Sequence, residues 1–87
     1  MLDAAQIESL RDVPIDQDSP NRVAAAIKLL GVTQRAVATE LGMTDAQMSD
    51  LCRGRYRAIR LETARRLAAY FGCSIEDLFP SREGAVA

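Results

Sequence analysis

The sequence predicts an all-α fold, and three observations support this expectation. Apolar side chains recur every three or four residues in several stretches, which is the spacing of one helix face. Each stretch opens near a serine, threonine or proline, or is followed by glycine or proline, and these residues begin and end helices. No segment alternates apolar and polar residues as a half-buried strand does. We expect a compact domain of five helices, over residues 20–30, 33–41, 44–53, 61–71 and 75–79.

Start and stop signals justify these helices in order. Ser19 and Pro20 begin the first, because serine caps helices and proline suits the first helical position. Thr33 caps the second helix, and glycines follow the first, second, third and fourth. Ser74 caps the last helix, which Pro80 stops. The apolar residues expected to face inward along the first four helices are Val23, Ala26, Ile27, Leu30, Val37, Ala38, Leu41, Met48, Leu51, Leu61, Ala64, Leu67, Ala68 and Phe71.

The stretch from Gln34 to Arg53 joins two of these helices at a single glycine, Gly42. A turn this short needs a left-handed backbone conformation, which glycine adopts without steric cost. It also needs small residues where the helices cross, and we expect Ala38 and Gly42 to fill that role. Thr44 opens the following helix with a Thr-x-x-Gln capping box. Two helices packed steeply through so short a turn form a helix-turn-helix.

Length and composition indicate one small globular domain. The chain has 87 residues, of which 48% are hydrophobic and 26% are charged, and these values argue against general disorder. No apolar run approaches the ~18 residues of a transmembrane helix, and the start lacks the pattern of a signal peptide. We therefore expect a soluble, cytoplasmic protein that does not bind membranes.

The net charge of −1 hides an uneven distribution of charged residues. Residues 1–20 carry a net charge of −4, whereas residues 53–66 carry six arginines and a net charge of +5. A cluster of arginines directly after a helix-turn-helix favours nucleic-acid binding, although the overall charge does not.

The two ends of the chain are expected to differ from the domain at residues 20–80. Residues 1–19 form an acidic arm and linker in this prediction, with a short helix over residues 2–13 as one interpretation. The arm is either mobile or loosely docked, or else it joins a dimer contact or competes with DNA for the arginines. Residues 81–87 are expected to form a frayed tail.

The chain resembles the Xre family, the helix-turn-helix proteins of the phage Cro and repressor type. The resemblance rests on two residue pairs, Thr33-Gln34 and Leu41-Gly42, and on the triplet Arg53-Gly54-Arg55. It also rests on the later segment LETARRLAAYFGCSIEDLF. It covers about residues 20–79. It implies a lambda-repressor-like fold of five helices, in which the helix at 44–53 enters the DNA major groove. It also implies that the helix at 33–41 lies across the DNA backbone and that binding is usually dimeric.

Two features depart from the family pattern. Many members link their first and third helices by a buried arginine–glutamate pair, and the matching residues here are Ile27 and Cys52. We expect an apolar contact in its place, because a buried ion pair and well-packed apolar residues are about equally stabilising. Asp45 and Asp50 lie on the presumed DNA face, where amides and bases are more usual.

Four residues of the helix at 44–53 are candidates for contact with DNA bases. Gln47 can bridge adenine through its amide, and Ala46 can contact a thymine methyl group. Asp50 can accept a hydrogen bond from cytosine, and Asp45 is a weaker candidate. Each has a structural alternative: Gln47 completes the capping box, Asp45 interacts favourably with the helix dipole, and Asp50 is a solvated charge.

A second group of residues is expected to hold DNA phosphates. Gln34 and Thr44 stand at the starts of the two helices, where side chains and free backbone N–H groups can bind a phosphate. Arg35 is a weaker candidate. The arginines after the helix-turn-helix would supply most of the charge, or else form a solvated basic loop; they are Arg53, Arg55, Arg57 and Arg60.

The predicted dimer interface consists of apolar residues without an obvious place in the core. They are Tyr56, Ile59, Phe79 and Val86. The alternative is that they cover the edge of the core of a single chain.

Taken together, these features predict a sequence-specific regulator that binds double-stranded DNA, most simply a Cro-like repressor acting as a homodimer on an operator with two half-sites. An enzyme is not expected, because the chain has no histidine and shows no metal cluster, cofactor motif or nucleophile–base pair. Cys52 and Cys73 are expected to be reduced thiols. The alternative function is a protein-interaction module, for example an antitoxin whose partner is a toxin, with weak or no DNA binding.

Overall fold

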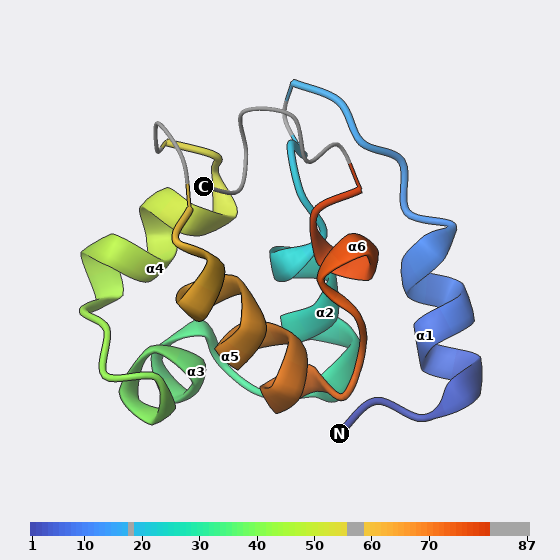
Figure 1. Cartoon of the computed structure of the whole chain (residues 1–87), viewed down its shortest axis with the longest axis horizontal. Helices are drawn as coiled ribbons and strands as arrows, with labels where there is room; N and C mark the ends of the chain where they lie inside the picture. Colours follow the sequence, from blue (N-terminus) through green and yellow to red (C-terminus); the bar gives the residue numbers. More distant parts are fainter. Residues whose placement is uncertain (18, 56–58, 81–87) are drawn as a thin grey trace.

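The computed structural model describes residues 1–17, 19–55 and 59–80. These residues contain six helices and no strand, which confirms the all-α fold class. The helices are α1 (Ala4–Arg11), α2 (Val23–Leu30), α3 (Gln34–Glu40), α4 (Asp45–Cys52), α5 (Leu61–Phe71) and α6 (Ile75–Leu78) (Figure 1). Helices α2 to α6 correspond to the five that were predicted, and α1 precedes them.

Local capping chemistry fixes the ends of most helices as the sequence predicts. The hydroxyl groups of Thr33, Thr44 and Ser74 each accept a hydrogen bond from a backbone N–H in the first turn of α3, α4 and α6. Gly31 and Gly72 end α2 and α5 in the left-handed conformation, with φ of 77° and 75°. These ends depend on neighbouring residues alone, and sequence patterns therefore identify them.

The start of α2 differs from the prediction. The helix begins at Val23 instead of Pro20, because residues 20–22 make contacts with distant parts of the chain. The buried side chain of Asn21 accepts a hydrogen bond from Val23 N (3.0 Å) and donates one to Leu51 O (2.9 Å). The N–H of Arg22 donates to Leu78 O (2.8 Å). These bonds tie the residues just before α2 to the ends of α4 and α6.

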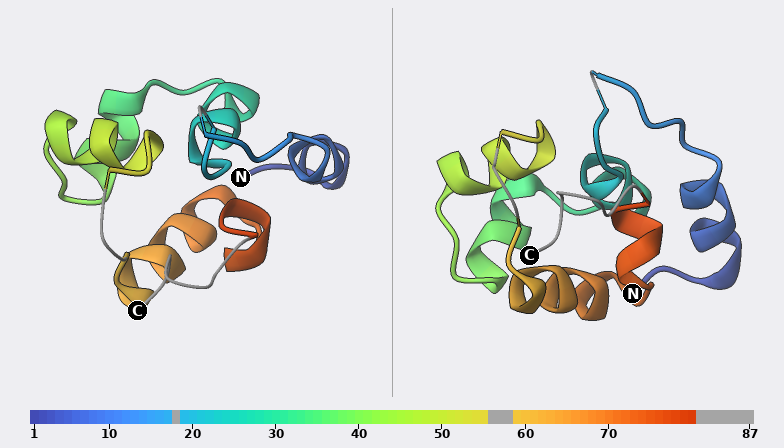
Figure 2. Two further views of the ribbon diagram at one scale, coloured as in Figure 1. Left: turned by 90° about the horizontal axis from the view of Figure 1, so that it is seen from above. Right: turned by 45° about the horizontal axis from the view of Figure 1, so that its top comes forward.

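The two helices of the helix-turn-helix, α3 and α4, pack against each other at one end of the molecule (Figure 2). Gly42 has φ of 68°, and the N–H of Met43 donates to Ala38 O (2.8 Å), so the turn closes as the sequence predicts. The prediction that Gly42 also supplies room is wrong, since a Cβ atom on it would meet nothing within 4 Å. Only the buried Ala38 fills the role of a small residue at the crossing.

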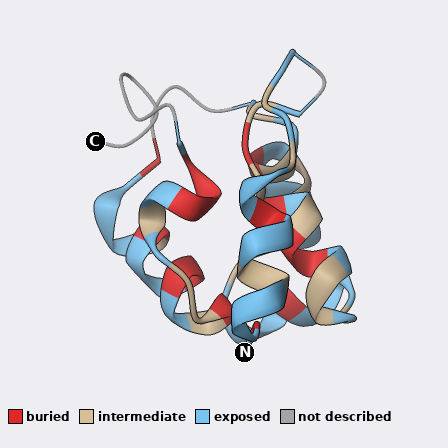
Figure 3. Ribbon diagram, turned by 90° about the vertical axis from the view of Figure 1, so that its right-hand side faces the viewer, coloured by how far each residue is buried: buried red, intermediate tan, exposed pale blue. Residues whose placement is uncertain are grey.

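One hydrophobic core joins all six helices of the described residues. Its largest fully buried side chains include Phe71, Phe79, Leu10, Met48 and Leu67. Figure 3 shows that each helix is exposed on its outer side and buried where it meets its neighbours.

Three of the apolar residues lie differently from their predicted places. Ile59 and Phe79 are only 5% and 1% exposed and belong to the core. The expectation that they lack a core position is therefore wrong, and their burial agrees with the alternative that they close the edge of the core. Leu61, predicted to face inward, is 41% exposed because it is the first residue of α5 and lies beyond the core. Tyr56 and Val86 lie outside the described residues.

The N-terminal segment forms a helix that packs on α2 and α6. Leu2 and Leu10 are buried, and Gln6 Nε2 donates to Leu29 O (2.9 Å). The guanidinium group of Arg22 donates to Val13 O (2.9 Å) and to Arg11 O (2.8 Å). The first residues of the chain thus belong to the same core as the helix-turn-helix. The division of the chain at residues 19 and 20 remains a prediction.

Candidate nucleic-acid interface

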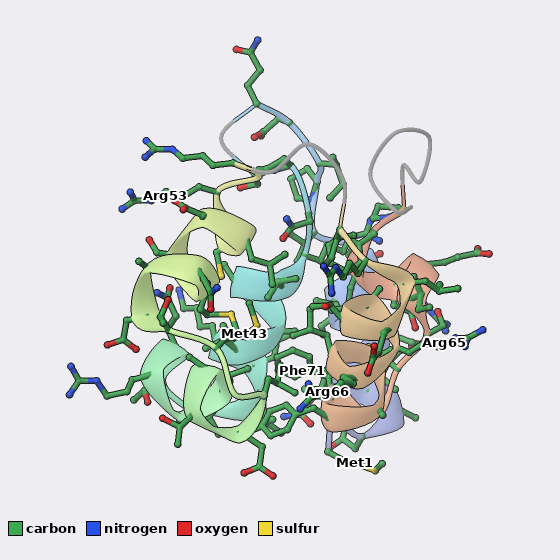
Figure 4. The ribbon with its side chains drawn as sticks, turned by 60° about the vertical axis from the view of Figure 1, so that its left-hand side comes forward. Met1, Met43, Arg53, Arg65, Arg66 and Phe71 are labelled. Atoms are coloured by element: carbon green, nitrogen blue, oxygen red, sulfur yellow. The ribbon has the colours of Figure 1, made fainter. Side chains whose placement is uncertain are left out.

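Helix α4 presents most of the candidate base-contacting residues to solvent. Met48 and Leu51 turn toward the core, and Ser49 is half-buried. The exposed residues of α4 and its C-cap are Asp45, Ala46, Gln47, Asp50 and Arg53. Figure 4 shows the Arg53 side chain extending away from the end of α4 into solvent. An exposed helix face of this length, on the second helix of a helix-turn-helix, can enter a major groove.

Gln47 is held by the capping box at the start of α4. Its Oε1 accepts a hydrogen bond from Thr44 N (2.9 Å), and its own N–H donates to Thr44 Oγ1 (3.1 Å). The structural role that the sequence suggested is therefore present. Its Nε2 group has two N–H donors that no described group accepts, so Gln47 can donate to a base while it caps the helix. A bidentate pairing with adenine also needs Oε1, which already accepts the Thr44 N–H.

An exposed ion pair links the two helices of the motif. Arg35 Nε lies 3.2 Å from Asp45 Oδ2, and both side chains are largely exposed. Such a pair contributes little stability, because solvent screens it and both side chains lose freedom. It does place a positive charge beside Asp45 and so reduces the repulsion between that carboxylate and DNA. The described residues offer no such partner to Asp50.

The phosphate candidates surround α4. Gln34 is the first residue of α3, and Thr44 is the N-cap of α4, where its hydroxyl accepts from Gln47 N and keeps its own hydrogen to donate. Arg53, Arg55 and Arg60 are exposed, and none forms an ion pair within the described residues. Their guanidinium groups can therefore bind phosphate without first leaving a carboxylate. Arg57 lies outside the described residues.

Comparison with known proteins agrees with this geometry. The family model for helix-turn-helix domains, HTH_3, matches residues 23–78, which is more than half of the chain. The chain belongs to this Xre-like helix-turn-helix family. Its members are DNA-binding regulatory domains. This protein is accordingly a DNA-binding helix-turn-helix regulator. Neither the curated proteins nor the solved structures gave a significant match.

The helix-turn-helix domain replaces the family's buried ion pair with a different link. Ile27 is buried in the core and the half-buried Cys52 packs against that core, and a direct apolar contact between the two stays a prediction. A polar connection also exists, because the Asn21 amide donates to Leu51 O at the end of α4. A Cβ atom on Gly54 would come within 2.5 Å of Pro20 Cγ, so the chain before α2 also packs closely on the residues after α4. No local sequence pattern indicates either contact, since both join residues about thirty positions apart.

Neither cysteine of the helix-turn-helix domain has the lowered pKa of a reactive thiol. Cys52 and Cys73 are free thiols, and burial raises the pKa of both. The pKa of Cys73 rises to about 11, through burial and the nearby carboxylate of Asp77. No group of three His, Cys, Asp or Glu residues in the described part of the chain could hold a metal ion. Within the same residues, no helix is long and apolar enough to cross a bilayer.

Proposed function

We propose that this protein binds double-stranded DNA in a sequence-specific manner and represses transcription as a homodimer on an operator with two half-sites. The observation that carries the proposal is the exposed face of α4, with unpaired arginines at its C-terminal end. A repressor of this kind performs no chemistry. It blocks access of RNA polymerase by occupying the operator.

Base recognition and affinity are divided between different residues in this proposal. Gln47 donates to a base edge and Ala46 contacts a thymine methyl group, whereas Asp50 accepts from cytosine N4. The carboxylate of Asp50 repels phosphate, so it favours discrimination between bases over affinity. Attraction to the DNA backbone comes from Arg53, Arg55 and Arg60.

The size of the molecule is compatible with a dimer on two adjacent half-sites. Its extents are 31 × 27 × 22 Å. Half-sites of helix-turn-helix dimers lie about 34–36 Å apart, which is one turn of the DNA helix. Two copies placed side by side fit this spacing without overlap. Ile59 and Phe79 serve the core of a single chain, so other residues would join the two copies.

The decisive experiment measures binding to a pool of random genomic duplexes by fluorescence anisotropy at several salt concentrations. We expect the logarithm of the binding constant to fall linearly with the logarithm of salt concentration, because bound arginines release counterions. Arg55→Ala should weaken binding to all sequences and lower the slope by about one. Arg65→Ala, on the exposed side of α5, is the matched control and should leave the slope unchanged. Binding that is absent or independent of salt would overturn the proposal.

Selection of bound sequences from random duplexes then tests specificity and the dimer. We expect an enriched motif with two related half-sites about one helical turn apart. A single unpaired motif would contradict the homodimer but not DNA binding.

A protein-interaction module is the second candidate, and the unpaired carboxylate of Asp50 at the middle of the recognition face favours it. An acidic group suits a basic protein surface as well as a cytosine. If no duplex is selected, binding of a protein partner to this face becomes the better explanation, and Asp50→Asn should weaken that binding.

A further inference from the structure

An open pocket lies beside the recognition helix, between the turn of the helix-turn-helix and α5. Its volume is about 560 Å³, and it is lined by Leu41, Gly42, Met43, Gln47, Arg60, Thr63 and Arg66. This volume falls within the range of about 300–1,000 Å³ that small-molecule sites occupy. Among these residues, only Gln47 and Arg60 are candidates for DNA contact from the sequence.

The polar side chains of the pocket are donors suited to an anion. Arg60 and Arg66 each carry a positive charge, and neither forms an ion pair with any described residue. The amide of Gln47 and the hydroxyl of Thr63 add uncharged donors. No carboxylate belongs to the lining, so nothing in it opposes a negative ligand. Two arginine forks facing one space match the oxygen atoms of a phosphate group.

The two neighbouring arginines of α5 lie in different surroundings. Arg66 lines the pocket, whereas Arg65 does not. Figure 4 shows Arg66 on the side of α5 that faces Met43, and Arg65 pointing away from it. Both are exposed and both carry the same charge. Substituting each in turn therefore distinguishes an effect of the pocket from an effect of the total charge of α5.

Two lining residues connect the pocket to the DNA-binding face. Gln47 stands in the exposed face of α4, and Arg60 immediately precedes α5 among the candidate phosphate-binding arginines. A ligand that accepts a hydrogen bond from Gln47 Nε2 would compete with a DNA base for the same N–H donor. Binding in the pocket and binding of DNA therefore draw on the same groups.

We propose that this pocket binds a phosphate group through Arg60 and Arg66, with Gln47 and Thr63 as additional donors, and that its occupancy is coupled to DNA binding. The coupling to DNA binding rests on the proposed function, whereas the binding of the anion does not. The phosphate group belongs either to a small phosphorylated molecule, whose carbon skeleton would lie against Leu41 and Met43, or to the backbone of the bound DNA.

The first arm of the test uses inorganic phosphate and the whole chain. Phosphate is titrated into ¹⁵N-labelled protein at constant ionic strength, with sodium chloride as the balancing salt. The Gln47 side-chain amide and the backbone amides of Met43 and Thr63 report on the pocket. A free-anion site predicts saturable shifts in the wild type and in Arg65→Gln, and affinity lower by about tenfold or more in Arg66→Gln, since a charged hydrogen bond is lost.

The second arm measures duplex DNA binding with the same three proteins. If the phosphate group comes from the DNA backbone, Arg66→Gln should lower the salt slope by about one, whereas Arg65→Gln should not. If it comes from a small molecule, inorganic phosphate should weaken DNA binding of the wild type beyond the ionic-strength control, and this effect should vanish in Arg66→Gln.

The proposal is overturned if Arg66→Gln and Arg65→Gln behave alike in both arms. Phosphate binding that depends on Arg66 but leaves DNA binding unchanged would overturn the coupling. Failure of the proposed function has a different signature, because all three proteins would then lack salt-dependent DNA binding while the phosphate arm still separates the two variants. Amide spectra of the free proteins verify that both variants are folded.

Discussion

At the scale of single residues, Gln47 combines a structural and a recognition role. Its Oε1 closes the capping box with Thr44 N, and its Nε2 remains free to donate. Thr44 supplies the other half of the box through its hydroxyl group. The two residues therefore share one structural feature, and each keeps a donor: the Gln47 amide for a base, and the Thr44 hydroxyl hydrogen for a phosphate.

Replacement of each partner of the capping box should give different results. Thr44→Ala removes the N-cap of α4 and should lower the free energy of unfolding by about 1 kcal/mol. Gln47→Ala leaves the Thr44 cap intact and should cost less, but it should change which bases are preferred. Chemical denaturation measures the first effect, and selection from random duplexes measures the second. An unchanged base profile in Gln47→Ala would show that this residue only caps the helix.

At the scale of helices, Asn21 connects the start of α2 to the end of α4. Its buried amide donates to Leu51 O and accepts from Val23 N. This link fixes the C-terminal end of the recognition helix, where Arg53 lies.

Two substitutions of Asn21 distinguish its bonds. Asn21→Ala loses both and should destabilise the protein by about 2 kcal/mol, because two hydrogen bonds of roughly 1 kcal/mol each are removed, although Leu51 O still accepts from Gly54 N. Asn21→Asp keeps an acceptor for Val23 N but cannot donate to Leu51 O. If the link to α4 orients the recognition helix, both variants should weaken DNA binding at temperatures where both are folded. Normal DNA affinity in Asn21→Asp would mean that the bond to Leu51 contributes to stability only.

A second connection between elements joins α1 to α6 through an ion pair. Arg11 Nε lies 2.7 Å from Asp77 Oδ1, and Asp77 is buried, with 8% of its side chain exposed. Hydrogen bonding by Arg11, followed by bonds from Ser74, holds the pKa of Asp77 below its ordinary value, although burial acts to raise it. The same pair raises the pKa of Arg11. The carboxylate also accepts the backbone N–H of Ser74 and so belongs to the capping box of α6.

The lowered pKa of Asp77 predicts acid sensitivity. In the unfolded chain Asp77 binds a proton near its ordinary pKa of 3.8, whereas in the folded chain it stays ionised to lower pH. The stability that it contributes is therefore fully present above about pH 4 and is lost as the pH falls further, toward the folded-state pKa. Arg11→Gln should lower the melting temperature at pH 7, and the difference from the wild type should shrink as the pH falls below 4. A difference that is independent of pH would contradict this assignment.

The elements also show which features a sequence can predict. The caps at Thr33, Thr44 and Ser74 were predicted correctly because each depends on residues three positions apart. The start of α2 was not, because it depends on bonds from residues 21 and 22 to Leu51 and Leu78. Local patterns carry no information about such distant partners.

The candidate site was predictable to a similar extent. Helical periodicity correctly placed the exposed residues of α4, because the core positions Met48 and Leu51 set the orientation of the helix. It could not show that Arg35 lies beside Asp45, or that Arg66 shares a pocket with Gln47, since both depend on how helices cross. It also left open whether Ile59 and Phe79 join a dimer interface or the core of a single chain, because a core of this size is completed by residues outside the periodic helices.

At the scale of the whole molecule, α1 and the proposed DNA interface lie at opposite ends. Helix α1 lies at one end and α4 at the other in all three views (Figures 1 and 2). The acidic residues Glu8 and Asp12 belong to α1 and its C-cap, at the end of the molecule away from α4. The longest extent of the molecule is 31 Å, whereas charges in physiological salt are screened over about 8 Å. Docking of α1 on α2 and α6 therefore argues against competition of Glu8 and Asp12 with DNA for the arginines.

This arrangement predicts that the position of an acidic residue, and not the net charge, decides its effect on DNA binding. Glu8→Gln combined with Asp12→Asn removes two negative charges but should change affinity for random duplexes by less than about twofold in physiological salt. Asp50→Asn removes one charge from the recognition face and should raise that affinity by about fivefold, equivalent to roughly 1 kcal/mol of repulsion in a water-like dielectric. Anisotropy titrations of the three proteins at one salt concentration make the comparison. If the double variant binds more tightly than Asp50→Asn, the N-terminal segment does interfere with DNA, and the separation of the two ends does not control recognition.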